Sequence, residues 1–230
     1  MPRTPIRLAA ALSCALAAAA HAQSFNIDID FPGSNPALGQ GAPSAAFGAA
    51  SGQVGVWNSV PSGGGPFALV DLAGGVTAAT MSIVGSTSLL AFNNPTNSGD
   101  YRLLMNDARQ IGTVVQGGTA TFTINNIANG SYQVWTYAAP PQGTPGSTNV
   151  TINSVSMFAT GGASGNAFSL GGTHVVHNVL VTGNSLTIIV NDPTGDGLPA
   201  YINGFQIVVP APGAAIAFFG LMPIALRRKR

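Results

Sequence analysis

The sequence predicts an all-β protein folded as an antiparallel β-sandwich, and more specifically as a jelly roll. Short runs of β-branched and aromatic residues recur between clusters of Gly, Pro, Asn and Ser, a pattern typical of strands joined by turns. Helical periodicity is almost absent, so the crossover helices that a parallel sheet requires cannot be placed. Gly and Pro together form about a fifth of the chain, below the roughly 25–30% that indicates a disordered sequence.

Eleven strands are expected, which is enough for two packed sheets with short antiparallel connections. Each run is rich in residues that favour strands, and each is bounded by residues that favour turns. The expected strands are residues 26–31, part of 53–60, 67–71, 76–84, 119–125, 131–137, 149–152, 155–159, 173–181, 185–190 and 201–209.

One segment is expected to be helical, and three are expected to be loops. In SGDYRLLMNDARQ, residues 98–110, Ser98 or Asp100 can cap a turn that carries Leu103, Leu104 and Met105. Backbone groups that pair with no strand must reach water, so glycine-rich segments are expected at the surface. These segments are residues 32–52, 61–66 and 160–172.

Residues 1–22 have the organisation of a secretory signal peptide. Arg3 and Arg7 give a positive start, residues 8–20 form an apolar run, and Ala20-His21-Ala22 has the small residues of a cleavage site. Signal peptidase is therefore expected to release a chain that begins at Gln23. The alternative is a lipoprotein acylated at Cys14, but the apolar run before that cysteine is very short.

The body, residues 23–209, is a single expected domain with an excess of acidic residues. Of the eight basic residues of the chain, two lie in the signal segment and four at the C-terminus, which leaves Arg102 and Arg109. All seven acidic residues are aspartates, and all lie in the body. Nucleic acids and anionic membrane surfaces bind clustered Lys and Arg, so neither is an expected partner of the body. The one cysteine, Cys14, lies outside it, so no disulfide is expected.

The segment SYQVWTY suggests a candidate ligand-binding surface. Alternation in a strand places Tyr132, Val134 and Thr136 on one face, and places Trp135 and Tyr137 on the other. An exposed pair of Trp135 and Tyr137 would form a flat platform on which a sugar ring can stack. The alternative is that these large aromatic side chains belong to the core.

Two sequence patterns resemble metal sites, and both have simpler explanations. DPTGDG places Asp192 and Asp196 as in the opening of a calcium loop, but Asn203 stands where such a loop supplies a bidentate Glu. The alternative is a turn between two strands. In HVVH, His174 and His177 would point to opposite faces of a strand, so they are not expected to chelate a metal together. No cofactor is predicted.

Catalytic motifs are scarce. Glutamate is absent, so a glycosidase would have to use two aspartates, which no motif identifies. The sequence also lacks G-x-S-x-G, H-E-x-x-H and a phosphate-binding loop. The segment 100–109 gathers four charged residues, for which local ion pairing is the favoured explanation and a polysaccharide-acting site the less favoured one. These residues are Asp100, Arg102, Asp107 and Arg109.

The C-terminus, residues 210–230, combines a proline bracket, a short apolar run and a basic cluster. Residues 213–226 are 14 residues, about 21 Å as a helix, which is short for a hydrocarbon core of about 30 Å. A buried core helix is the alternative. The terminal cluster favours a membrane anchor whose basic end stays in the cytoplasm. The bracket is Pro210, Ala211 and Pro212, and the cluster is Arg227, Arg228, Lys229 and Arg230.

This arrangement resembles the PEP-CTERM sorting signal of Gram-negative bacteria, with Ala211 in place of the usual Glu. The body is also similar to secreted β-sandwich proteins that carry such a tail, in FTINNIANGSYQVWTY and YINGFQIVV, and a galactose-binding-like jelly roll is expected for it. The resemblance implies an exported, non-enzymatic protein of the cell surface or extracellular matrix. It implies an exosortase-type sorting enzyme as a partner and a transient anchor in the inner membrane. The alternative function is a carbohydrate-binding module acting on extracellular polysaccharide.

Overall fold

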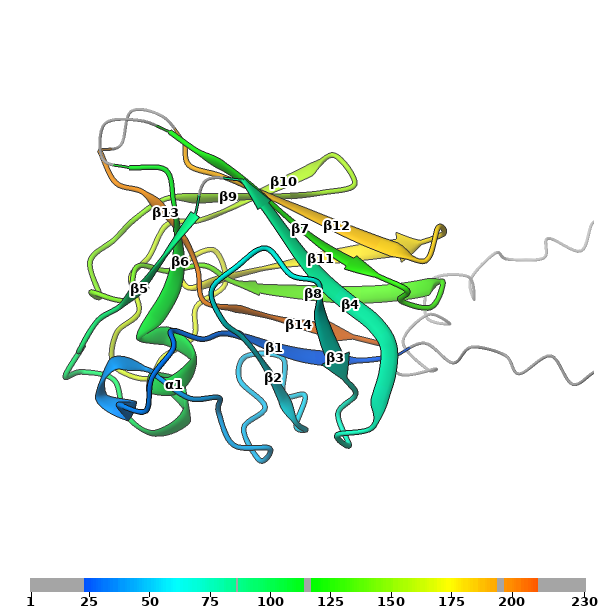
Figure 1. The fold of residues 1–230 in the computed structure, drawn as a ribbon. Helices are drawn as coiled ribbons and strands as arrows, with labels where there is room; N and C mark the ends of the chain where they lie inside the picture. The colour runs from blue at the N-terminus through cyan, green and yellow to red at the C-terminus, as the bar shows by residue number, and fades with distance from the viewer. Residues whose placement is uncertain (1–22, 86, 114–116, 194–196, 211–230) are drawn as a thin grey trace, which may run out of the picture.

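The computed structural model describes residues 23–85, 87–113, 117–193 and 197–210, which form a β-sandwich (Figure 1). The prediction of a mostly antiparallel all-β fold is confirmed. The strands are β1 (Phe25–Ile29), β2 (Trp57–Val60), β3 (Phe67–Val70), β4 (Val76–Gly85), β5 (Thr87–Ala91), β6 (Asp107–Ile111), β7 (Thr119–Asn125), β8 (Gly130–Tyr137), β9 (Thr148–Ile152), β10 (Val155–Ala159), β11 (His174–Val181), β12 (Ser185–Asn191), β13 (Ala200–Ile202) and β14 (Gly204–Val208).

The described strands form three sheets. Sheet A has the order β11-β8-β14-β1-β2, sheet B the order β10-β9-β12-β7-β4-β3, and the small sheet C the order β13-β6-β5. The pair β1 and β2 is parallel, which departs from the expected antiparallel pairing, because the long loop between them returns the chain in the same direction. Asn58 links the edges of sheets A and B, since its side chain binds both Asn26 O and the backbone of Val70.

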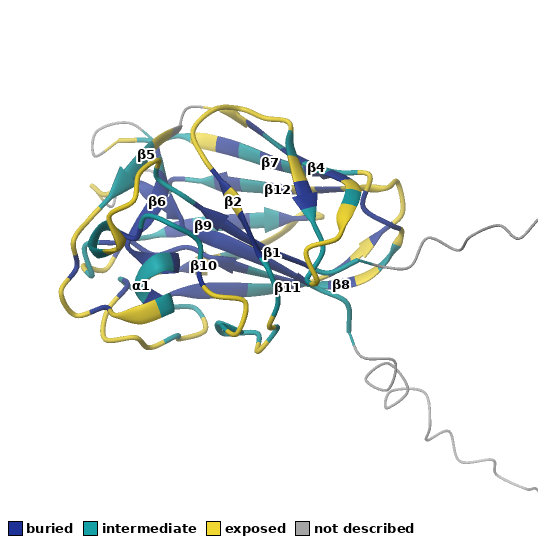
Figure 2. Cartoon of the chain, turned by 60° about the horizontal axis from the view of Figure 1, so that its bottom comes forward, coloured by how far each residue is buried: buried dark blue, intermediate teal, exposed yellow. Residues whose placement is uncertain are grey.

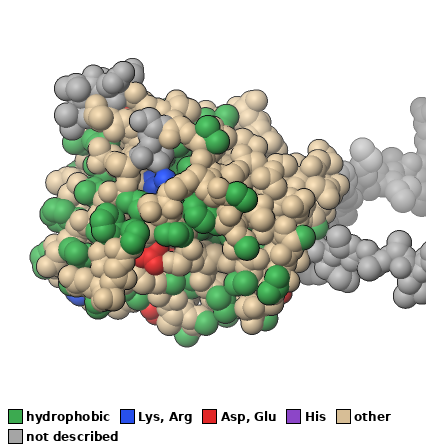
Figure 3. Space-filling model, in the orientation of Figure 1, with side chains coloured by type: hydrophobic (Ala, Val, Ile, Leu, Met, Phe, Trp, Pro, Cys, Tyr) green, Lys and Arg blue, Asp and Glu red, His purple; other side chains and the backbone are tan. Residues whose placement is uncertain are grey.

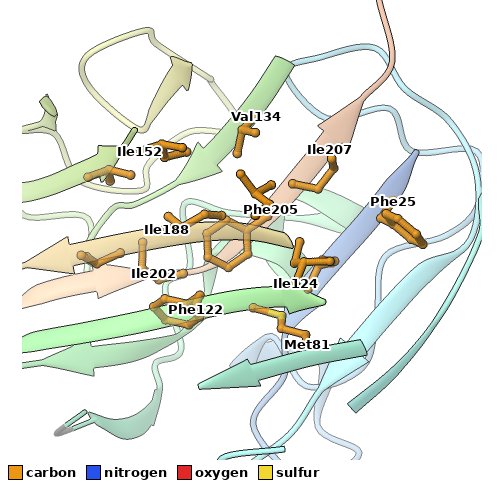
Figure 4. Packing of buried hydrophobic residues seen from close by; sticks show 14 of the residues in the cluster. Phe25, Met81, Phe122, Ile124, Val134, Ile152, Ile188, Ile202, Phe205 and Ile207 are labelled. Carbon is orange, nitrogen blue, oxygen red and sulfur yellow. The ribbon is translucent and has the colours of Figure 1, made fainter. Parts of the chain in front are cut away.

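The main hydrophobic core lies between sheets A and B (Figure 4). Sheet A contributes Phe25, Phe205 and Ile207, and sheet B contributes Met81 and Phe122, all fully buried. The rings of Phe122 and Phe205 meet edge-on across the two sheets with centroids 5.2 Å apart. Apolar side chains alternate with polar ones along these strands, so one face of each sheet is buried against the other.

Most strands lie where the sequence predicts them, with three differences. Strands β5 and β6 were not predicted, and the predicted strand 201–209 is divided into β13 and β14. The division occurs at Asn203, whose Nδ2 donates to the carbonyl oxygens of Met105 and Asp107 while its Oδ1 accepts from Ala139 N. The backbone of Asn203 still pairs with sheet A, since its N donates to Tyr137 O and its O accepts from Ile29 N, whereas β13 before it pairs with β6 of sheet C.

The segment 98–110, expected to be helical, forms α1 (Gly99–Met105), with Ser98 at its N-cap position and no side-chain cap, whereas its residues 107–110 belong to strand β6. Its buried residues are Tyr101, Leu104 and Met105. Leu103, which was expected on the same turn, is only partly buried. A short 3-10 helix, Pro36–Leu38, precedes it in the chain and lies against it.

The outer face of sheet A is covered by loops rather than by solvent. Residues 42–50, α1 and the segment around Phe168 form a second hydrophobic cluster over this face. Figure 2 shows the loops and α1 lying in front of the buried strands β1 and β8. The segments 32–52 and 160–172 are loops as expected, but they also bury the face below them, which the prediction of surface loops did not include.

The two ends of the described body lie side by side. Strands β1 and β14 are antiparallel neighbours, and Val209 N donates to Ser24 Oγ at 3.0 Å. The body therefore begins and ends at one end of the sandwich, whereas α1 and sheet C lie toward the other (Figure 1). Within the described ranges there is no helix with the length and apolarity needed to cross a membrane.

Candidate functional site

The candidate site is the covered face of sheet A, which is defined by side chains that point away from the main core. The register aligns His174, Tyr137, Gly204 and Asp28 across four strands, and Trp135, Gln206 and Asn26 in the next row. In β1, Phe25, Ile27 and Ile29 enter the core, so Asn26 and Asp28 must face the covering loops. The face has an aromatic region on β8 and β11, an amide region on β14, and an acidic region on β1.

Gln206 is the centre of the amide region. Its Oε1 accepts from Tyr137 Oη at 2.5 Å and from Ser51 Oγ at 2.7 Å, and its Nε2 donates to Asn26 Oδ1 and Gln53 O. These bonds hold residues 50–55 against the sheet. Burial raises the pKa of Tyr137 far above its usual value, although bonds from Ala50 and Ser51 lower it slightly, so the phenol remains protonated.

The aromatic region buries one of the two predicted ligand-binding residues. Tyr137 is fully buried, and it contacts the rings of Phe168 and His174. Trp135 is partly buried and stacks on His174, with centroids 5.2 Å apart and an interplanar angle of 24°. The predicted exposed platform of Trp135 and Tyr137 is therefore wrong for Tyr137, because the loop that carries Phe168 covers it. Trp135 retains an exposed part.

The two histidines of HVVH lie on opposite faces of β11, as predicted. His174 belongs to the covered face, and His177 points to the other side, where its Nε2 lies 3.1 Å from Val155 O. Burial lowers the pKa of both imidazoles. Both rings are therefore neutral at pH 7, and the structure does not bring them together as metal ligands.

The acidic region contains two fully buried aspartates. Neither carboxylate oxygen of Asp28 has a hydrogen-bond partner, and Oδ1 of Asp107 has none either. Oδ2 of Asp107 accepts from Phe31 N at 2.7 Å. The neighbouring Asp30 is engaged, because it accepts from Gly41 N and from the hydroxyl of Ser59. Burial raises the pKa of both Asp28 and Asp107, and repulsion from nearby aspartates raises them further.

The four charged residues of segment 100–109 are not joined by the predicted local ion pairing. Asp100 accepts from the backbone N and hydroxyl of Ser44, and Arg102 donates from Nε to Asn97 O. Arg109 donates from Nη2 to the carbonyl oxygens of Pro61 and Gly63, both at 2.8 Å. Asp100 and Arg102 lie on α1, whereas Asp107 and Arg109 lie on β6, and the side chains bind different segments. These side chains hold loops, as predicted, but in the described part of the chain they bind backbone groups and a serine hydroxyl and do not pair with one another.

Several predicted site residues lie outside the described residues. These are Cys14, Ala20, Ala22, Asp196, Ala211, Pro212, Arg227, Arg228, Lys229 and Arg230. Pro210 is the last residue described, directly after Val209. Asp192 is buried, and its backbone N donates to Gly118 O. The calcium loop of Asp192 and Asp196 stays a prediction.

Sequence reasoning missed Asp28, Asn26 and Gln206 as members of one face. The alternation FNIDI does indicate that Asn26 and Asp28 share a face opposite Phe25 and Ile27. It does not indicate that loops cover that face, because a polar row beside an apolar row is ordinarily solvent-exposed. Phe168 lies in a glycine-rich segment, and no pattern in the sequence indicates that it covers this face.

No known protein family matches the chain, and no curated protein does. Among solved structures, the exo-β-1,3-galactanase Pc1,3Gal43A of Phanerochaete chrysosporium matches 60% of this chain and 32% of its own, at 19% identity and a TM-score of 0.35. TmCBM61 in complex with β-1,4-galactotriose matches 56% of this chain and 88% of its own, at 12% identity and a TM-score of 0.34. The plant receptor-like kinase FER matches 83% of this chain and 43% of its own, at 14% identity and a TM-score of 0.42. Because all three TM-scores are below 0.5, we infer nothing about function from them.

Proposed function

We propose that this chain is an exported, non-enzymatic protein of the cell surface or extracellular matrix, delivered by a C-terminal exosortase-type sorting signal. The observation that carries the proposal is the basic cluster 227–230, which follows a short apolar run in a chain whose body has two basic residues. Signal peptidase would cleave after Ala22, and the tail would hold the body at the outer face of the inner membrane until it is released.

The position of the two ends supports this proposal. Ser24 and Val209 are hydrogen-bonded neighbours, so the segments that precede and follow the body join it at one end. A tail that continues from Pro210 therefore leaves the opposite end, with α1 and sheet C, directed away from the membrane. The surface in Figure 3 carries few charged side chains, which suits a partner without charge.

The test of this proposal is a tail in which Arg227, Arg228, Lys229 and Arg230 are replaced by Ser. The apolar run alone is marginal, since 14 residues fall below the usual span of roughly 17–25. Without positive charge at its end, the chain should pass through the membrane and appear outside with its tail intact. If the neutralised variant is anchored and cleaved like the wild type, the basic cluster has no sorting role.

A second candidate function, carbohydrate binding, is favoured by one observation at Trp135. Trp135 is partly exposed, and its ring is stacked on His174 at an interplanar angle of 24°. A fixed aromatic ring is the kind of surface on which a sugar ring stacks.

Binding to a panel of neutral polysaccharides would test this second candidate. Trp135→Ala should abolish binding while the circular dichroism spectrum is unchanged. Phe158→Ala is the matched control, because Phe158 is an exposed aromatic residue on sheet B. Equal loss of binding in both variants, or no binding by the wild type, would exclude a site at Trp135.

A further inference from the structure

Asp28 and Asp107 present three buried carboxylate oxygens that no group of the described protein satisfies. Both side chains are fully buried. The three oxygens are Oδ1 and Oδ2 of Asp28 and Oδ1 of Asp107. Buried polar atoms are nearly always hydrogen-bonded, and a buried carboxylate without a partner is among the most costly groups in a fold. Something other than the described protein groups must therefore compensate them.

The two residues are neighbours although 79 positions separate them in the sequence. Asn203 connects their strands, because its carbonyl oxygen accepts from Ile29 N and its Nδ2 donates to Asp107 O at 2.9 Å. Phe31 N donates to Oδ2 of Asp107 at 2.7 Å, which fixes that carboxylate beside the end of β1. Burial and, after it, repulsion from the nearby Asp107 raise the pKa of Asp28. Hydrogen bonds that involve the backbone of both segments therefore fix the position of Asp107 relative to the end of β1.

Two charged groups lie near the pair. Asp30, which directly follows β1, is held by Gly41 N and Ser59, and its negative charge adds to the repulsion. Arg109 on β6 is the nearest basic residue in sequence to Asp107, and its Nη2 donates to Pro61 O and Gly63 O. Asp28 itself faces Gly204 of β14 and Ser59 of β2 in the sheet register, and neither residue carries a charge. The surroundings of the pair are thus acidic.

Either a shared proton or a cation can neutralise such a pair, and the three unsatisfied oxygens distinguish the two. One proton shared between the carboxyl groups creates one donor and one acceptor, so one of the three oxygens is left without a partner. A hard cation can be coordinated by all three oxygens at once, and carboxylates commonly coordinate calcium in bidentate fashion. We propose that Asp28 and Asp107 bind a calcium ion beneath the loop that follows β1.

The proposed ion takes part of its shell from the protein carboxylates and the rest from other oxygens. In the described ranges, no group of three or more His, Cys, Asp or Glu side chains could hold a metal ion. The site therefore rests on two carboxylates, and backbone carbonyl groups and water would complete the six to eight oxygens of calcium. Binding would fasten β1 of sheet A to β6 of sheet C and hold the covering loop in place.

Calcium titration of the full chain in mild detergent, after removal of metal with EDTA, tests the proposal. Calcium at 100-fold excess over its dissociation constant should raise the unfolding midpoint by roughly 5–10 °C. Isothermal titration calorimetry should show one calcium ion per chain. Binding must displace the protons that burial favours on the two carboxyls, so affinity should increase from pH 6 to pH 8.

Two variants and one control identify the site. Asp28→Asn and Asp107→Asn should each lose calcium binding at least tenfold. Asp71→Asn, which makes the same change in charge on the turn between β3 and β4, should bind like the wild type. If either buried variant fails to fold, the wild type still tests the proposal through its calcium stoichiometry and the pH dependence of its calcium affinity. No calcium binding by the wild type, or binding that Asp28→Asn retains, would overturn the proposal in favour of a shared proton.

Discussion

Single polar side chains attach the covering loops to sheet A. Tyr137 is the clearest case, because its hydroxyl accepts from Ala50 N at 2.9 Å and donates to Gln206 Oε1. Replacing Tyr137 with Phe would leave both of these buried groups with one partner fewer. The variant should therefore loosen residues 47–55 as well as lower the stability of the whole domain.

We expect Tyr137→Phe to lower the free energy of unfolding by about 1–3 kcal/mol, measured by urea denaturation. The comparison is Tyr132→Phe, which removes one bond from the hydroxyl to Ala128 O on the other face of β8. A smaller loss, about 1 kcal/mol, is expected there. A neutral effect of Tyr137→Phe would mean that the network around Gln206 does not hold the loop.

The buried carboxyls of Asp28 and Asp107 should make the metal-free protein less stable as the pH rises. Burial raises the pKa of Asp107 to about 9, whereas an aspartate in the unfolded chain titrates near 4. Between these values the folded state binds more protons than the unfolded state, so stability is greatest at the low end and is lost as the pH rises toward 9.

The window for this measurement is pH 7–9 in EDTA. Below about pH 6.5 the buried neutral rings of His174 and His177 give the opposite slope, because the unfolded state then binds more protons. The urea midpoint should fall steadily from pH 7 to pH 9, and the slope should be shallower in Asp28→Asn. A midpoint that stays constant over this range would show that the carboxyls are already ionised in the fold, because neither state would then bind protons there.

At the scale of elements, the contact between sheets A and B depends on the pair Phe122 on β7 and Phe205 on β14. Phe205→Ala should lower the free energy of unfolding by about 3–5 kcal/mol, because it removes a fully buried ring and leaves a cavity. Phe158→Ala, on the half-exposed ring of β10, should change it by less than about 1 kcal/mol. Equal losses in the two variants would contradict the packing described.

The elements that the sequence predicts best are those whose local pattern agrees with the fold. Strands β7 and β10 lie where alternation and turn residues place them, and α1 lies within the predicted helical segment. Strand β6 was missed because its residues, Asp107 to Ile111, follow a helical pattern in the sequence and pair only through the distant β5 and β13. The break at Asn203 likewise depends on contacts with Met105, Asp107 and Ala139.

The candidate site is less predictable for a related reason. Alternation assigns Trp135 and Tyr137 to one face, but only the tertiary structure shows that Phe168 and its loop cover Tyr137. The same holds for Asp28, whose burial results from residues distant in the sequence. A single sequence specifies which side chains share a face of a strand, whereas the fold decides which face water reaches.

At the scale of the whole molecule, the body should fold without either terminal segment. Its core is formed within the described residues, its ends meet at Ser24 and Val209, and the sequence of the body contains no cysteine. Residues 23–209 alone should give a circular dichroism spectrum of β structure with little helix, in reducing and non-reducing buffer alike. A strongly helical or unfolded spectrum would mean that the terminal segments contribute to the fold.

The intact mass of the protein recovered from its native host tests export and sorting most directly. In a host that possesses the sorting enzyme, the mass should correspond to a chain that begins at Gln23 and ends near residues 210–213. In the same host without that enzyme, the C-terminal segment should be retained, and the protein should remain with the membrane. A secreted wild-type protein that keeps its basic C-terminus, or an N-terminus at an acylated Cys14, would contradict the account.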